Sequence, residues 1–280
     1  MNSYTDDELT ALLAEAIRAA RIGGAVDHAA FGSVRAAAVE QKAGTRWNPV
    51  TEIDRRSEQA ITTFLSQAHP DHAFLGEENM AGQARGAEQT WIVDPIDGTA
   101  NFIHGVPHYS VSVGFAQAGE VLVAACLDVE RDELFTAIRG RGAWLNGQAL
   151  TRRDTDDESA GALAQAMVCT GFYYDRGVMM ERTLGAIGAL FREGIHGLRR
   201  SGSAVLDICW TAAGRYDAYF EYELGPWDYA AAALVASEAG LRLAAGDGSP
   251  LTLDSGSLVC GTPGLFDHLL EIVTAGSPNG

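Results

Sequence analysis

The stretch that decides the fold is Trp91-Ile92-Val93-Asp94-Pro95-Ile96-Asp97-Gly98-Thr99. Its first three residues are apolar and predict a short buried strand that delivers the carboxylate of Asp94. Pro95 has no N–H to donate and is expected to stop the strand there. A second carboxylate, Asp97, precedes a glycine that tolerates the backbone angles of a tight turn. Two such acids can hold a divalent cation through oxygen ligands. The alternative for an isolated Asp-x-x-Asp-Gly is a surface turn with solvated acids.

The composition is that of a globular protein with a large excess of acids. The chain has 280 residues, of which 47% are hydrophobic and 20% charged, and its formal net charge is −17. It contains no basic stripe, so nucleic acid is not expected as a partner. The first ten residues are polar and acidic, unlike a signal peptide, and no apolar run approaches the length of a membrane span. These features predict a cytoplasmic protein with no membrane partner.

The cysteines support the same location. The sequence contains Cys126, Cys169, Cys209 and Cys260. They are widely spaced and form no Cys-x-x-Cys pair, which argues against zinc and redox motifs. Each has apolar neighbours in the sequence, so we expect buried free thiols in a reducing cytosol.

The first half of the sequence predicts helices followed by an antiparallel meander. Apolar residues at helical spacing predict one long bent helix, or two in tandem, from Asp6 to about Val39, with an interruption at Gly23-Gly24. Thr51 is expected to cap a second helix that ends at about Ala68. Strands are expected at 73–76, 109–116, 121–129 and 133–138, and Asn146-Gly147 is a strong hairpin signal.

The second half alternates strands with helices and predicts a layered α/β arrangement. The polar and acidic segment 152–159 marks the expected boundary between a domain of residues 1–153 and a domain of residues 154–280. Strands are expected at 166–170, 197–200 and 216–222, and helices at 179–191, 203–213 and 226–239. Segments 258–260 and 263–273 close the chain.

Acids at the ends of predicted elements form the candidate site. They are Asp54, Glu77, Asp94, Asp97 and Asp228. Each has an ordinary alternative, such as a helix cap for Asp54, a charged loop for Glu77 and a residue that matches the helix dipole for Asp228. As a group they suit magnesium, which binds oxygen ligands and usually shares them with substrate phosphate. Two such ions about 4 Å apart can stabilise both the attacking water and the leaving oxygen in phosphoryl transfer.

Several motifs, in the same order along the chain, resemble the inositol monophosphatase family. They are Phe74-Leu75-Gly76-Glu77-Glu78, Asp94-Pro95-Ile96-Asp97-Gly98-Thr99-Ala100-Asn101-Phe102 and Trp227-Asp228, with Asn48-x-Val50-Thr51-x-x-Asp54 upstream and Arg200-x-Gly202-Ser203-Ala204 between the last two. The similarity covers nearly the whole chain. It implies an α+β protein with a layered α-β-α-β-α sandwich fold, usually found as a homodimer.

The resemblance also implies a metal site with two or three Mg²⁺ ions. Glu77 and Asp94, with the backbone carbonyl of Ile96, would bind the first ion. Asp94, Asp97 and Asp228 would bind the second. Glu78, the neighbour of the first ligand, is not assigned to metal.

Catalytic and substrate-binding roles follow from the same resemblance. Glu77 and Thr99 would orient the attacking water, with Thr99 hydrogen-bonded to Asp54. The N–H groups of Gly98 and Thr99 would hold the phosphate. The residues implied at the substrate are Asp97, Ala204, Glu221 and Asp228.

The expected activity is Mg²⁺-dependent hydrolysis of a phosphomonoester, with inositol 1-phosphate as the first choice of substrate and inhibition by lithium. Branches of the family that act on nucleotide or histidinol phosphates often carry a basic residue soon after the threonine, where this chain has Ala100. Segment 171–176 and the loop around Lys42 depart from animal members. Histidinol phosphate, fructose 1,6-bisphosphate and a 3′-phosphonucleotide therefore stay open as substrates. A non-enzymatic role as a binding partner is the alternative from another class.

Overall fold

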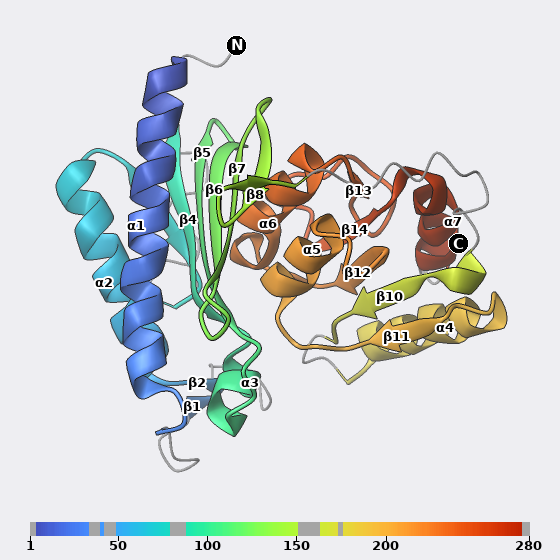
Figure 1. The fold of residues 1–280 in the computed structure, drawn as a ribbon. Helices are drawn as coiled ribbons and strands as arrows, with labels where there is room; N and C mark the ends of the chain where they lie inside the picture. The colour runs from blue at the N-terminus through green and yellow to red at the C-terminus, as the bar shows by residue number, and fades with distance from the viewer. Residues whose placement is uncertain are drawn as a thin grey trace.

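The fold consists of five alternating layers of helices and sheets (Figure 1). The structure is a computed structural model, and it describes residues 4–33, 40–41, 49–78, 88–150, 163–172 and 176–275. The α-β-α-β-α sandwich expected from the sequence is confirmed. Within the described ranges, no helix has both the length and the apolar character that a membrane span requires.

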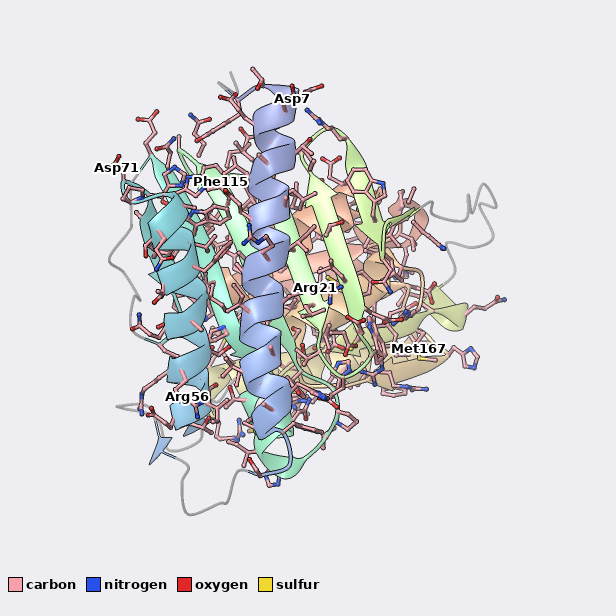
Figure 2. All side chains as sticks on the ribbon, turned by 60° about the vertical axis from the view of Figure 1, so that its left-hand side comes forward. Asp7, Arg21, Arg56, Asp71, Phe115 and Met167 are labelled. Atoms are coloured by element: carbon pink, nitrogen blue, oxygen red, sulfur yellow. The ribbon has the colours of Figure 1, made fainter. Side chains whose placement is uncertain are left out.

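The first layer consists of two helices that lie side by side on one face of the larger sheet (Figure 2). Helix α1 spans Asp6–Ala30 and helix α2 spans Glu52–Ala68. The predicted interruption at Gly23-Gly24 is wrong, because α1 continues through both glycines. A Cβ on Gly23 would lie 2.6 Å from Ile61 Cδ1 of α2, so the glycine lets the helices approach closely. The predicted extension to Val39 is also wrong: α1 ends at Ala30 and a turn follows, while residues 34–39 lie outside the described part.

The second layer is a seven-stranded sheet that confirms the predicted meander. Its strands are β3 (Ala73–Gly76), β4 (Gln89–Asp97), β5 (Ser110–Gln117), β6 (Glu120–Asp128), β7 (Glu133–Ile138), β8 (Gly142–Leu145) and β9 (Gln148–Ala149). They lie in this order in the sheet, and only the β3–β4 pair is parallel. The Asn146-Gly147 turn joins β8 to β9 as predicted. A separate short pair, β1 (Glu40–Gln41) and β2 (Pro49–Val50), precedes α2, while the loop around Lys42 lies outside the described residues.

The third layer lies between the two sheets and forms the centre of the core (Figure 1). It consists of helix α5 (Ala204–Ala212) and helix α6 (Pro226–Glu238). Small residues allow α6 to lie close to the sheet: a Cβ on Gly114 of β5 would be 3.5 Å from the Cβ of Ala231.

The remaining layers complete the C-terminal half. The second sheet has the order β11-β10-β12-β14-β13. Its strands are β10 (Met167–Thr170), β11 (Gly197–Arg199), β12 (Ala218–Tyr222), β13 (Arg242–Ala244) and β14 (Ser257–Gly261). Helices α4 (Val178–Arg192) and α7 (Pro263–Ala275) cover its outer face, and a 3₁₀ turn, η3 (Leu163–Gln165), precedes β10. Strand β13 was not predicted, because three residues are too few to show an alternating pattern. The predicted boundary between residues 153 and 154 lies outside the described residues and stays a prediction.

The cysteines agree with expectation, since all four are buried and free.

The close contact between β5 and α6 predicts the effect of enlarging Gly114. In Gly114→Val the Cβ fits, but the branched methyl groups must overlap Ala231, whose Cα and N also lie 3.7 Å from the Cβ position. We expect a loss of about 1–3 kcal/mol in the free energy of unfolding, measured by urea titration. Gly114→Ala is the matched control and should stay close to wild type. Equal stability of the Val and Ala variants would contradict the close packing.

Candidate active site

A bulge at the end of β4 turns two carboxylates toward one cavity. Asp94 pairs with Ser112 and Asp97 pairs with Ser110, so three steps along β4 match two steps along β5. Residues three apart in a regular strand point to opposite faces, and the extra residue of a bulge cancels this alternation. Pro95 lies in the irregular part, where its missing N–H costs no ladder hydrogen bond. The prediction that Pro95 ends the strand is therefore wrong, because β4 continues to Asp97.

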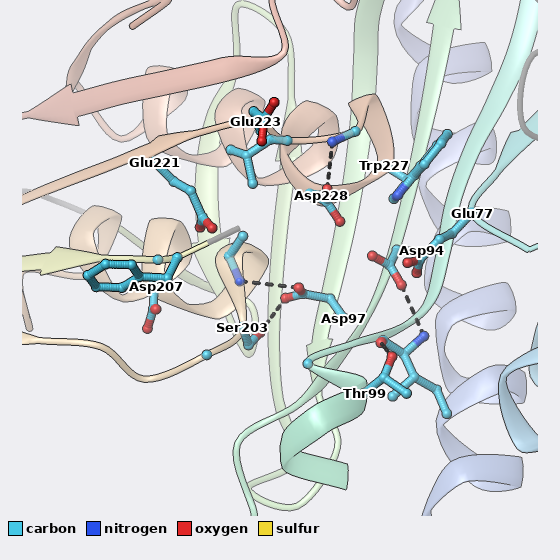
Figure 3. A pocket seen from close by; sticks show the side chains of 18 of the residues that line it. Glu77, Asp94, Asp97, Thr99, Ser203, Asp207, Glu221, Glu223, Trp227 and Asp228 are labelled. Atoms are coloured by element: carbon cyan, nitrogen blue, oxygen red, sulfur yellow. Dashed lines mark hydrogen bonds between the residues drawn. The ribbon is translucent and has the colours of Figure 1, made fainter. Parts of the chain in front are cut away.

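Carboxylates from two distant parts of the chain converge at this point (Figure 3). Asp94, Asp97 and Asp228 each offer an oxygen atom, and these atoms all lie within 4.8 Å of one another. Asp228 comes from the first turn of α6 and accepts a hydrogen bond from the N–H of Gly225 at 2.6 Å. Glu77, at the end of β3, lines the same cavity.

Asp97 also joins the N-terminus of α5 to the end of β4. Its carboxylate accepts the N–H of Ala204 at 3.2 Å and the N–H of Val205 at 2.9 Å. The hydroxyl groups of Ser203 and Ser110 also donate to it. Free N–H groups at a helix N-terminus stabilise a negative charge. Ser203 was expected at the start of this helix, but no local pattern in the sequence indicated that the helix would pack against Asp97.

Asp54 and Thr99 form a hydrogen-bonded pair beside the carboxylates. Asp54 occupies the third position of α2, and Thr99 begins the short helix α3 (Thr99–His104). The Thr99 hydroxyl lies 3.1 Å from Asp54 Oδ1 and 3.1 Å from the carbonyl oxygen of Ile96. The other Asp54 oxygen accepts from the N–H of Thr51 at 2.8 Å, which completes the predicted capping box.

The cavity has a volume of about 470 Å³ and extends from β4 to the second sheet. Its far wall is acidic, with Glu221, Asp207 and Glu223. Glu221 accepts a hydrogen bond from the hydroxyl of Tyr219 at 2.6 Å. Among the described residues that line the cavity, Arg200 is the one Lys or Arg side chain.

The structure brings the residues predicted for the site together. The cavity is lined by Glu77, Asp94, Ile96, Asp97, Gly98, Thr99, Ala204, Glu221 and Asp228. Asp54 lies behind Thr99 and is fully buried, and Asn48 of the upstream motif lies outside the described residues. The individual roles stay predictions. Phe172, Asp207 and Glu223 also line the cavity, and no motif in the sequence had marked them.

Burial and neighbouring negative charges raise the pKa values of four acids at the site. Burial raises the pKa of Asp54 and of Asp97 to about 6 in each case, with Glu77 adding repulsion to both. Burial followed by repulsion from Glu77 and Asp97 raises the pKa of Asp228 well above its usual range. Burial raises the pKa of Glu221 to about 8. Hydrogen bonds from the protein therefore offset the negative charge in this cavity only in part.

These features fit a divalent cation. The converging atoms are carboxylate oxygens, which are the ligands that Mg²⁺ prefers. A cation among them would also offset the burial and the repulsion that raise the pKa values of Asp97 and Asp228.

Comparison with known proteins agrees with this geometry. Residues 8–275 match the description "Inositol monophosphatase family". Over 262 residues the chain is 40% identical to a Pseudomonas aeruginosa protein named Nus factor SuhB, covering 92% of this chain and 94% of that relative. Over 256 residues it is 36% identical to the Inositol-1-monophosphatase of Rhizobium meliloti, covering 89% of this chain and 91% of that one. The structure of the Thermotoga maritima IMPase matches with a TM-score of 0.84 at 27% identity, covering 95% of this chain and 98% of that chain.

The fold and the acidic cavity are thus those of a phosphatase of the metal-dependent class. The chain belongs to the inositol monophosphatase family.

The raised pKa values predict how stability depends on pH without metal. The pKa values of Asp54 and Asp97 rise from 3.8 to about 6, and the pKa of Glu221 rises from 4.5 to about 8. At a pH between the unfolded and the folded pKa value of such a group, the folded protein therefore binds more protons than the unfolded chain. Stability contributed by these protons is present at low pH and is lost as pH rises through the folded pKa values.

We therefore expect the melting temperature of metal-free protein to fall between about pH 5 and about pH 8, and added Mg²⁺ to raise it more at the higher pH. Sodium chloride at matched ionic strength is the control. An equal effect of Mg²⁺ at both pH values would contradict the assignment of these carboxylates to a cation site.

Proposed function

We propose that this protein is a Mg²⁺-dependent phosphomonoesterase that acts on a small polyol monophosphate, with inositol 1-phosphate as the first candidate. The observation that carries the proposal is the group formed by Asp94, Asp97 and Asp228, whose oxygens lie within 4.8 Å of one another in a cavity that Glu77 also lines. The relative named Inositol-1-monophosphatase supports the choice of substrate.

The residues that would hold the metal lie directly after β3, in β4 and in α6. Glu77 and Asp94, with the carbonyl oxygen of Ile96, would hold one ion, and Asp94, Asp97 and Asp228 would hold a second. When bound, Mg²⁺ would polarise the phosphoryl group and lower the pKa of the attacking water.

The Thr99–Asp54 pair offers a path for the proton of that water. Thr99 can donate to Asp54 across 3.1 Å and, through its oxygen, accept a hydrogen bond from water next to Glu77. As the water oxygen bonds to phosphorus and the bond to the alcohol oxygen breaks, one proton passes through Thr99 to Asp54, and solvent protonates the leaving alkoxide. The raised pKa of Asp54, about 6, makes it a better base than an ordinary aspartate. The N–H groups of Gly98 and Thr99 would hold the phosphate.

The far wall of the cavity favours a leaving group rich in hydroxyls. Glu221, Asp207 and Glu223 offer oxygens that accept hydrogen bonds from hydroxyl groups, and Ala204 leaves room beside them. Asp207 and Glu223 would repel a second phosphate, as in fructose 1,6-bisphosphate or a 3′-phosphonucleotide. Histidinol phosphate, whose leaving group carries an ammonium, stays the alternative on the same fold.

Replacing Asp94 tests the metal assignment. Asn keeps an oxygen that can accept the N–H of Ile96, now 3.1 Å from Asp94 Oδ1, so Asp94→Asn should stay folded. It loses a charge that both proposed ions would share, and we expect phosphate release to fall at least about 100-fold, measured with inositol 1-phosphate and a Mg²⁺ titration. Asp71→Asn on the surface is the matched control. A folded Asp94→Asn protein with normal turnover would refute the assignment.

A panel of substrates tests the choice of leaving group. We expect kcat/KM to be about 10-fold or more higher for inositol 1-phosphate than for fructose 1,6-bisphosphate, because the second phosphate meets the acidic wall. Glu223→Gln should narrow this ratio, and Glu271→Gln, on an exposed part of α7, should not. A wild-type preference for the bisphosphate would overturn this part of the proposal.

A second candidate function comes from the relatives named Nus factor SuhB, the first of which is 40% identical to this chain. A non-enzymatic role as a binding partner needs surfaces that bind other molecules and does not need the carboxylates of the proposed metal site. Asp94→Asn separates the two, since it should retain any such partners in a pull-down while it loses turnover. The homodimer, the lithium inhibition and the cytoplasmic location implied earlier stay predictions.

A further inference from the structure

Helix α2 carries a second buried acid, Glu58, one turn after Asp54. Only 1% of Glu58 is exposed to solvent, although it is a charged residue near the middle of a helix. Residues four apart on a helix lie on the same face, so Glu58 and Asp54 both point away from solvent on the side of α2 that packs on the protein. The pair of Asp54 and Thr99 already has a place in the mechanism, but nothing so far explains Glu58.

The contacts of Glu58 lie on both sides of one site residue. Its Oε1 accepts the N–H of Glu78 at 3.0 Å. The same oxygen lies against Gly76, where a Cβ would be 2.3 Å from it, so any larger residue at this position would displace the Glu58 carboxylate. Between these two neighbours lies Glu77, whose side chain lines the cavity with the three aspartates.

We propose that Glu58 is a positioning residue for Glu77. Its carboxylate lies against Gly76, the last residue of β3, and accepts the N–H of Glu78, which lies beyond the end of the strand, so it contacts the backbone on both sides of Glu77. The Glu77 side chain then emerges on the side of the cavity, and Glu78 emerges elsewhere. This inference rests on the proposed function in one respect, namely that Glu77 binds the metal. Loss of a group that orients a metal ligand without touching the metal commonly lowers metal affinity about 10- to 100-fold.

Two conservative variants of Glu58 separate the effect of side-chain length from the effect of charge. Glu58→Gln loses the charge but keeps an oxygen at the same distance along the side chain, so it can still accept the N–H of Glu78. Glu58→Asp keeps the charge but is shorter by one carbon, which takes the oxygen out of reach of that N–H. We expect Glu58→Asp to weaken Mn²⁺ binding about 10-fold or more, and Glu58→Gln to keep most of the affinity. Isothermal calorimetry with Mn²⁺ as the probe measures this on the full chain, without substrate.

A third variant reaches the same contact from the other side. Gly76→Ala places a methyl group where Glu58 Oε1 lies, and we expect a loss of Mn²⁺ affinity similar to that of Glu58→Asp. Glu52→Gln, exposed in the first turn of the same helix, is the matched control and should bind Mn²⁺ as wild type does. Thermal melts monitored by circular dichroism confirm that each variant is folded.

Each outcome supports the inference or removes it. Wild-type affinity in folded Glu58→Asp and Gly76→Ala proteins would overturn it, as would a Glu58→Gln protein that loses as much affinity as Glu58→Asp. In active protein, the weakened variants should recover turnover at high Mg²⁺ with an unchanged KM for substrate, which a general loss of structure would not produce. If wild type binds Mn²⁺ and hydrolyses no substrate, the proposed function fails while this inference is still tested by affinity alone.

Discussion

Like charges gathered in a buried cavity must be offset, and this requirement governs how the layers of the protein meet. Each acid has its own donors at the N-terminus of one or two helices. Asp97 accepts N–H groups from the start of α5, Asp54 accepts from Thr51 and Thr99, and Asp228 accepts from Gly225 before α6. Because α2, α5 and α6 pack on the larger sheet that carries Asp94 and Asp97, the positions of these helices affect the geometry of the carboxylates.

The sequence predicted those parts of the structure that depend on local chemistry. The capping box at Thr51 and the Asn146-Gly147 hairpin depend on residues within a few positions, and both form as expected. The meander depends on apolar runs separated by turn residues, which are also local signals. The set of residues that line the cavity was found through motifs of the inositol monophosphatase family, since no local pattern brings residue 94 next to residue 228.

The parts that the sequence did not predict depend on contacts between distant residues. A glycine pair inside a helical pattern predicts a break, but Gly23 instead gives space to Ile61 of another helix. Pro95 predicts the end of a strand, but a register shift against β5 accommodates it and aligns Asp94 with Asp97. Glu58 reads as an ordinary helix residue until the backbone of Glu78 is seen against it. In each case the deciding partner is remote in the sequence.

The order of the carboxylates along the chain has a consequence for protein synthesis. Two of the converging acids lie at the end of β4, and the third arrives only with α6, more than a hundred residues later. A ribosome adds residues from the N-terminus, at about 5–20 per second. The growing polypeptide therefore spends several seconds with an incomplete set of ligands, and a prematurely terminated chain that stops before Pro226 would never complete it.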